Sequence, residues 1–330
     1  MTGHPAPALA APPQLAPRTG APNWRPELAA CQDSAGRGQL DRMSASSALS
    51  PLLRHFRAEP SRTWSLIVTL YGDAVVPRGG TLWLGTLLEV CAALEIGPNA
   101  VRTATSRLAA DGWLERVRVG RNAFYRLGAR GQAGFAAAAR RIYGADRPEW
   151  DGSFQLAVLG PVAQEACRSA LEQAGFATLA PGVLIAAAAA PGADAAAAIR
   201  LRATTDDDSA RRLARQVWIP ARLEDGYRRF LASFAPLRAA LAAGLALGDL
   251  EALVARLLLV HEYRRLVLRD PMLPDALLPP DWPGIAARRL CAALYPALVA
   301  ASERWLDAHA LNEGGRLPAP ESDLAGRFRA

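Results

Sequence analysis

A helix followed at once by a hairpin constrains the fold of this chain more than any other feature of the sequence. Residues 99–110 place apolar side chains at helical spacing, and Asp111-Gly112 then ends the helix. Two short apolar segments and a tight turn complete the hairpin, at residues 113–117, 123–127 and 120–122. Because a helix and paired strands follow one another within one short segment, we predict an α+β fold.

Two further helices are expected before this unit. Ser61 can cap a helix whose apolar side chains follow helical spacing, and Gly72-Asp73 is expected to end it. A short extended segment at residues 81–84 then leads into a helix expected over residues 86–95. Helix, helix, short turn, helix and hairpin is the order of a winged helix-turn-helix, which we predict for residues 56–145.

Positive charge is concentrated in the same segment. The chain of 330 residues carries 38 basic and 31 acidic side chains, a net charge of +7, and contains no lysine. Nine arginines and two acidic residues lie between Asn99 and Gly144, so this segment alone accounts for a charge of +7. A basic charge confined to one unit indicates a polyanionic partner, and we predict duplex DNA.

The helix over residues 99–110 has an inward and an outward face on a helical wheel. The inward face consists of Val101, Ala104, Thr105 and Leu108. The outward face combines long donors with short side chains that let the backbone approach the DNA. On this face we predict DNA contacts by Asn99, Arg102, Thr103, Ser106 and Arg107.

The hairpin is expected to supply a second set of DNA contacts. Arg118, Arg121 and Asn122 lie at or near its tip, where an arginine can reach the sugar-phosphate backbone or a narrow minor groove. The alternative interpretation is a solvated helix face beside a charged hairpin on an ordinary small domain.

The remainder of the chain divides into four parts. Residues 1–55 are rich in Pro, Ala, Gly and Ser and are expected to be a disordered tail. Strands at 154–159, 178–187 and 199–204 with helices at 162–174 and 208–217 indicate a small ferredoxin-like domain over residues 146–220. Helices at 223–234, 236–247, 250–268 and 286–309 indicate a helical effector and dimer domain over residues 221–310. Residues 311–330 are expected to be a flexible tail.

Several classes of protein are disfavoured by composition. The cysteines are scattered without a CxxC pair, so we expect neither a disulfide framework nor a metal site, and no cofactor. Prolines interrupt the first 26 residues, which disfavours a secretory signal, and Pro181-Gly182 breaks the longest apolar stretch. We therefore expect a soluble, cytoplasmic protein without a membrane partner. Met43 directly precedes the first periodic segment, and one hypothesis is that translation starts there.

Motifs in both halves of the chain resemble those of one family. The amino-terminal motifs are Ser65–Asp73, Pro77-Arg78-Gly79-Gly80, Val101-Arg102-Thr103, Ser106-Arg107-Leu108 and Asp111-Gly112-Trp113-Leu114. The carboxy-terminal motifs are His261-Glu262-Tyr263-Arg264-Arg265, Arg269-Asp270-Pro271 and Asp281-Trp282-Pro283-Gly284. Together they resemble the PaaX family of phenylacetate-degradation repressors, over nearly all of residues 62–306.

This resemblance implies a dimeric, non-catalytic transcription factor that represses genes of aromatic-acid catabolism. In the family's best-known members phenylacetyl-coenzyme A binds the protein and releases it from its operator. The helix that carries Arg102, Thr103, Ser106 and Arg107 matches the family's DNA-reading helix.

The carboxy-terminal motif leaves two interpretations open. Arg264, Arg265 and Arg269 could neutralise effector phosphates while His261 and Tyr263 orient the acyl end. Alternatively, His261 and Glu262 form a satisfied polar cluster that holds the proline-rich loop against its helix.

Enzymatic alternatives have little support. The motif at His261 is not HExxH, because the fourth residue after it is Arg265, and no nucleophile elbow or phosphate loop is present. A nuclease-like protein would need acidic metal ligands, for which Asp206-Asp207-Asp208 is the only candidate, and a helix cap explains that run more simply. An acyl-coenzyme A-binding enzyme with the winged helix as an interaction module is the second alternative.

Overall fold

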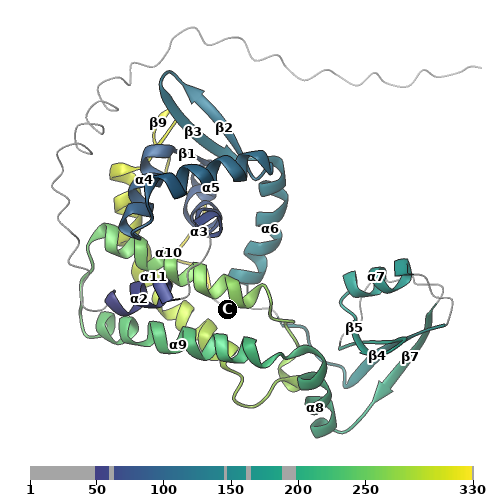
Figure 1. The fold of residues 1–330 in the computed structure, drawn as a ribbon. Coiled ribbons are helices and arrows are strands. Elements are labelled where there is room, and N and C mark those ends of the chain that lie inside the picture. The colour runs from purple at the N-terminus through teal and green to yellow at the C-terminus, as the bar shows by residue number, and fades with distance from the viewer. Residues whose placement is uncertain (1–48, 59–62, 145–146, 161–164, 188–197, 329–330) are drawn as a thin grey trace, which may run out of the picture. The chain divides into compact units, whose positions relative to one another are not determined.

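The computed structural model describes residues 49–58, 63–144, 147–160, 165–187 and 198–328 (Figure 1). The expected tail before residue 49, and with it the hypothesis about Met43, lies outside the described residues. The prediction of disorder is wrong for the last residues of the expected tail, because helix α2 (Ser50–Ala58) begins there. The side chains of Leu49, Leu52, Leu53 and Phe56 are buried. Their spacing is that of one apolar helix face, too short a signal to stand out after a proline-rich tail.

The first long helix does not end where the sequence suggested. Helix α3 (Thr63–Leu70) continues into a π-helical segment, η1 (Tyr71–Val75), and a 3-10 turn, η2 (Val76–Arg78). Gly72 therefore does not act as a helix stop. A Cβ atom on Gly72 would lie 2.4 Å from the ring of Phe135, so glycine permits a close approach to that ring. The chain turns at Gly79, whose φ of +86° favours glycine.

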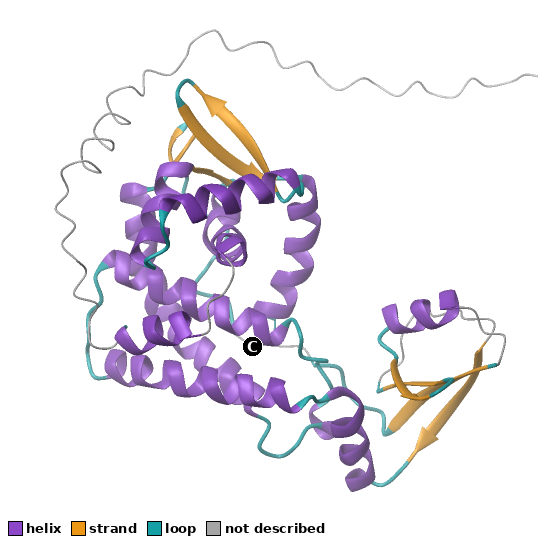
Figure 2. Ribbon diagram, in the orientation of Figure 1, coloured by secondary structure: helices purple, strands orange, loops and turns teal. Residues whose placement is uncertain are grey.

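The elements that follow agree with the expected order. Strand β1 (Thr81–Trp83), helices α4 (Leu84–Ala93) and α5 (Pro98–Ala110), and strands β2 (Leu114–Val119) and β3 (Asn122–Leu127) succeed one another. The strands form an antiparallel sheet in the order β1-β3-β2 (Figure 2). The predicted inward face of α5 is confirmed, since Val101, Ala104, Thr105 and Leu108 are buried.

Helix α6 (Ala129–Tyr143) has no counterpart among the predicted elements. Only Gly131 and Ile142 of this helix are buried, so it lacks the apolar periodicity that marks a core helix. Its many alanines, which favour helix intrinsically, are the signal that could have found it.

The middle segment forms a four-stranded antiparallel sheet. Its elements are β4 (Ser153–Leu159), α7 (Glu165–Gln173), β5 (Ala177–Ala180), β6 (Val183–Ala186), β7 (Ala198–Thr204) and α8 (Asp207–Trp218), with strand order β5-β6-β4-β7. The single strand expected over residues 178–187 is wrong, because Pro181-Gly182 makes a turn in which Gly182 has a φ of +77°. Edge strand β7 exposes two large apolar side chains, Ile199 at 66% and Leu201 at 48%.

Residues 221–309 form three long helices joined by loops and one 3-10 turn. Helix α9 (Ala221–Ala242) is one helix rather than the expected two. It runs through Pro236, and burial of Phe234 and Leu237 on either side compensates for the hydrogen bond that proline removes. Helix α10 (Asp249–Val267), the 3-10 turn η3 (Asp275–Leu277) and helix α11 (Pro283–His309) follow.

Helices α10 and α11 pack against each other in the core. Helix α11 is long and apolar enough to cross a membrane by length and composition, a test that core helices of globular proteins also pass. It buries Leu290, Leu294, Tyr295 and Leu298, among others, inside the fold.

The prediction of a flexible tail over residues 311–330 is wrong for its described part. Strands β8 (Leu311–Asn312) and β9 (Gly315–Arg316) form a small hairpin. The side chains of Leu317, Leu324 and Phe328 are buried, and the ring of Phe328 lies 5.1 Å from that of Tyr143. Their spacing is compatible with a helix, but Pro318, Pro320 and Gly326 interrupt the segment, so no regular element could be predicted for it.

Described residues therefore contain both helices and antiparallel sheets, and the predicted α+β class is confirmed.

Candidate nucleic-acid interface

The five residues of helix α5 that the sequence nominated for DNA contact all lie on its exposed side. Asn99, Arg102, Thr103, Ser106 and Arg107 are all exposed. The opposite side of the helix packs into the core, and α5 contacts α3, α4 and β2. This packing fixes the direction in which the exposed side chains point.

Local features define where α5 begins and ends. Pro98 occupies the first turn, where its missing N–H would have no helical partner. The Thr105 hydroxyl donates hydrogen bonds to the carbonyls of Val101 and Arg102, each at 3.0 Å, so this inward threonine is satisfied without a ligand. Asp111 ends the helix, and Gly112 follows with a φ of +72°.

The β2–β3 hairpin carries exposed basic side chains toward its tip. Arg118 and Arg121 are exposed and Asn122 is half-buried, at a turn where Gly120 has a φ of +61°. Arg126 differs from them, because it pairs with Glu115 through hydrogen bonds of 2.7 and 3.0 Å. That hydrogen bond holds the pKa of the Glu115 carboxyl below its usual value. Arg126 is therefore engaged by a carboxylate, whereas Arg118 and Arg121 near the tip are exposed.

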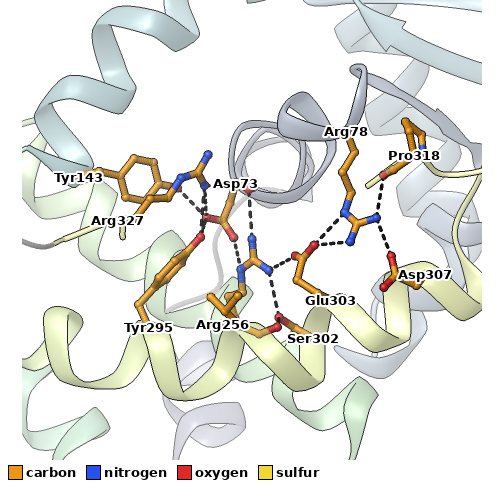
Figure 3. A network of polar contacts seen from close by, with 11 residues as sticks. Asp73, Arg78, Tyr143, Arg256, Tyr295, Ser302, Glu303, Asp307, Pro318 and Arg327 are labelled. Carbon is orange, nitrogen blue, oxygen red and sulfur yellow. Dashed lines mark hydrogen bonds and ion pairs between the residues drawn. The ribbon is translucent and has the colours of Figure 1, made fainter. Parts of the chain in front are cut away.

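A buried polar network, which the sequence did not reveal, joins η1 to the carboxy-terminal helices (Figure 3). At its centre the Asp73 carboxylate accepts a hydrogen bond from Arg256 Nε at 2.7 Å and one from Arg327 Nη1 at 3.0 Å. The hydroxyls of Tyr143 and Tyr295 donate to the same carboxylate at 2.7 and 2.8 Å. Four side chains from α6, α10, α11 and the tail thus converge on one residue.

Electrostatics explain why Asp73 remains charged inside the protein. Burial alone would raise the pKa of its carboxyl, but Arg256, Arg327 and the two tyrosine hydroxyls outweigh that effect and hold the pKa below its ordinary value. Burial raises the pKa of the Tyr143 and Tyr295 hydroxyls, so both remain hydrogen-bond donors.

The network continues from Arg256 toward the turn at η2. Arg256 also contacts Glu303 and donates to the Ser302 hydroxyl at 3.0 Å. Glu303 accepts from Arg78 Nε at 2.9 Å, and Arg78 reaches Asp307 at 2.9 Å. Arg78 and Arg256 are both fully buried. A buried, fully paired arginine of this kind serves the structure and is not available for DNA.

The structure separates the five residues that the sequence nominated for effector binding. His261 is buried, with its Nδ1 atom 2.9 Å from the Thr69 hydroxyl of α3. Burial, together with the neighbouring Arg264 and Arg265, lowers the pKa of His261 to about 3, so the ring is neutral near pH 7. Arg264 donates to the carbonyl and hydroxyl of Ser65 at 2.9 and 2.6 Å.

Tyr263 is also buried, and its ring lies 5.9 Å from that of Phe230. His261, Tyr263 and Arg264 therefore join α10 to its neighbours, whereas Arg265 and Arg269 line a cavity. His261 contacts Thr69 of α3, and Glu262 pairs with Arg265, so the contacts shown for these two side chains do not lead to the proline-rich loop. Asp270 holds that loop instead, accepting hydrogen bonds from the Tyr227 hydroxyl at 2.9 Å and from the backbone of Met272 at 2.8 Å.

Two family models and one curated protein match this chain. The family model "PaaX-like protein" matches residues 62–131, and "PaaX-like protein C-terminal domain" matches residues 218–308. Among curated proteins, "Transcriptional repressor PaaX" of Escherichia coli (strain K12) is 34% identical over 301 residues, which cover 86% of this chain and 95% of that protein.

Among solved structures, "Uncharacterized protein Rv0674 from Mycobacterium tuberculosis" is 26% identical and gives a TM-score of 0.43, over 66% of this chain and 87% of that chain. The curated relative belongs to the class of transcriptional regulators. This chain belongs to the PaaX family, and the resemblance drawn from its motifs is confirmed.

Proposed function

We propose that this protein is a transcriptional repressor that binds duplex DNA through a winged helix-turn-helix over residues 56–145. The observation that carries this proposal is the exposed, arginine-flanked face of α5, whose opposite face is buried, beside a hairpin with exposed arginines. Membership in the PaaX family, with a repressor among its members, supports the same conclusion.

In the proposed complex α5 enters the major groove. Arg102 lies near the start of the helix and can donate two hydrogen bonds to a guanine edge, while Arg107 on the flank meets the phosphate backbone. Thr103 and Ser106 are short enough to let the helix approach the bases. Arg118, Arg121 and Asn122 of the hairpin contact the sugar-phosphate backbone or the minor groove.

The remaining parts of the chain are assigned to assembly and regulation. We propose a ferredoxin-like domain over residues 146–220, and the antiparallel order β5-β6-β4-β7 supports it. We propose a helical effector domain over residues 221–310. A homodimer would space two reading helices roughly 34 Å apart on a pseudo-palindromic operator. The exposed Ile199 and Leu201 favour edge strand β7 as the contact between the two copies.

The ligand that releases the operator is proposed to be an acyl-coenzyme A, with phenylacetyl-coenzyme A as the first candidate. This assignment follows from the family, and it makes the protein a non-catalytic regulator of an aromatic-acid catabolic operon. A ligand that binds the DNA-incompetent state a hundredfold more tightly would supply about 2.7 kcal/mol for release.

The nuclease-like alternative has a simpler structural explanation. Its candidate metal ligand, the Asp206 carboxylate, accepts a hydrogen bond from the Ser209 backbone at 2.9 Å and so caps helix α8. Within the described ranges no group of three or more His, Cys, Asp or Glu side chains is arranged to hold a metal ion.

Salt-resolved binding to the protein's own upstream DNA tests the repressor proposal. We expect Arg102→Ala to weaken binding roughly tenfold to a hundredfold and to relax preference at one base position. Arg121→Ala should weaken binding to all sequences similarly and reduce the salt slope by about one unit. Arg211→Ala, on α8, is the matched control and should bind like the unmodified protein. If both test variants bind like the control, α5 and the hairpin do not form the DNA interface.

A further inference from the structure

A cavity of about 400 Å³ lies between α2, α9 and α10. Among the described residues that line it are four arginines: Arg222 and Arg229 of α9, Arg265 of α10, and Arg269, which follows the end of α10. Arg222 and Arg229 are seven residues apart and therefore lie on one face of α9, whereas Arg265 and Arg269 come from the end of α10 and the turn after it. The cavity therefore has basic groups on two of its walls.

The cavity has an excess of positive charge. Among the described residues that line the cavity, Glu262 is the one with an acidic side chain, and it already pairs with Arg265 at 3.2 Å. Within the part of the chain that the structure describes, no carboxylate within 4.0 Å pairs with Arg222 or Arg269. Among the described lining residues arginines outnumber carboxylates, and Arg222 and Arg269 have no carboxylate partner there, which favours an anionic ligand. Guanidinium forks match phosphate oxygens with two parallel hydrogen bonds.

Apolar side chains complete the lining. Leu223, Phe230 and Leu266 contribute to the walls, so the ligand can bury a hydrocarbon or aromatic portion as well as its charge. Gly226 belongs to the same lining, and a Cβ atom there would lie 2.6 Å from Leu266 Cδ2. Glycine at this position therefore allows α9 and α10 to approach closely beside the cavity.

Helix α10 connects the cavity directly to helix α3. Residues Glu262, Arg265 and Arg269 face the cavity, while the neighbouring His261 and Arg264 bond to Thr69 and Ser65 of α3. Helix α3 in turn packs against α5. A ligand that draws Arg265 away from Glu262 would thus act on the same turn of α10 that holds α3.

We propose that this cavity binds a phosphate-bearing ligand with an apolar portion, and that Arg222, Arg229, Arg265 and Arg269 hold its phosphate groups. The effect of this ligand on DNA rests on the proposed function, but its binding to the cavity does not. The site includes Arg222 and Arg229 of α9, which no sequence motif indicated.

Calorimetric titration of the full-length protein in the absence of DNA tests the site. The probes are coenzyme A, phenylacetyl-coenzyme A, inorganic pyrophosphate and phenylacetate. We expect the thioester to bind most tightly, coenzyme A and pyrophosphate more weakly, and phenylacetate weakest. The double variant Arg222→Ala/Arg269→Ala should lose roughly tenfold or more in affinity for the thioester per arginine. The control is Arg238→Ala, an exposed arginine of α9 outside the cavity lining.

Several results would overturn the proposal. These are no binding of any phosphate-bearing probe at millimolar concentration, equal affinities for the double variant and the control, or tightest binding by phenylacetate. DNA binding by the double variant, measured without ligand, should match that of the control. If the double variant loses DNA affinity instead, the arginines belong to a nucleic-acid surface, and the cavity proposal fails while the protein's DNA binding stands.

Discussion

Replacing Asp73 by asparagine tests whether the buried network stabilises the fold. The substitution preserves size but removes the charge that Arg256 and Arg327 face at 2.7 and 3.0 Å. Arg256 is fully buried and would keep Glu303 as its only ionic partner among the described residues. Removing one partner of a buried ion pair costs about 3–5 kcal/mol, because the other charge remains desolvated.

Thermal unfolding followed by circular dichroism provides the assay. Each kcal/mol shifts the Tm of a large domain by about 2–4 °C, so Asp73→Asn should lower the Tm by roughly 6–20 °C. Asp307→Asn is the matched control, because its side chain is 61% exposed and its pair with Arg78 contributes less than about 1 kcal/mol. Equal Tm values for the two variants would refute the reasoning.

The same substitution has a pH signature with a defined sign. The pKa of Asp73 lies below its ordinary value in the folded protein, so the charge stabilises the fold above the unfolded pKa of about 3.9. This contribution is lost as the pH falls through the folded pKa. The difference in Tm between Asp73→Asn and the unmodified protein should therefore be full at pH 7 and shrink below about pH 4. A difference that grows on acidification would contradict the assignment.

Three further predictions concern other parts of the fold. The pKa of His261 is about 3 in the folded protein, below its ordinary value of 6.5, so the imidazole is protonated in the unfolded chain first as the pH falls. The free energy of unfolding should therefore decrease by up to about 1.4 kcal/mol per pH unit from pH 6.5 toward pH 3. His261→Gln should flatten that part of a denaturation series. Deleting residues 324–330, which include the buried Leu324 and Phe328, should lower the Tm by several degrees, and an unchanged Tm would restore the flexible-tail prediction. If the proposed homodimer forms through β7, Leu201→Glu should shift the mass measured by light scattering toward that of a monomer, whereas an unchanged dimer mass would favour a contact within residues 221–310.

The sequence patterns predicted those helices and strands whose formation depends on residues close together in the chain. Helix α5 follows from the spacing of Val101 and Leu108, and the hairpin follows from the turn at Gly120. Both depend on residues close together in the chain, so periodicity and turn chemistry suffice. The exposed face of α5 could be nominated for the same reason.

The buried network could not be predicted in this way, because its partners are distant in sequence. Asp73 and Arg256 are 183 residues apart, and no periodicity relates them. One signal was present: Arg256 interrupts an apolar run in α10, where a charged side chain requires a buried partner. That signal indicates the need for a partner without identifying Asp73.

The network joins two of the amino-terminal family motifs to the carboxy-terminal helices and tail. Asp73 and Arg78 belong to the amino-terminal motifs, whereas their partners lie on α10, α11 and the tail. A buried ion pair adds little net stability compared with an apolar contact, but it tolerates few geometries, because each unpaired charge is costly. The segment that leads into the proposed DNA-binding elements can therefore dock on the carboxy-terminal helices in few ways. A ligand that shifts α10 must either move η1 with it or break the pair between Arg256 and Asp73. In both cases a movement of α10 alters the position or the contacts of η1, the segment that precedes η2 and β1.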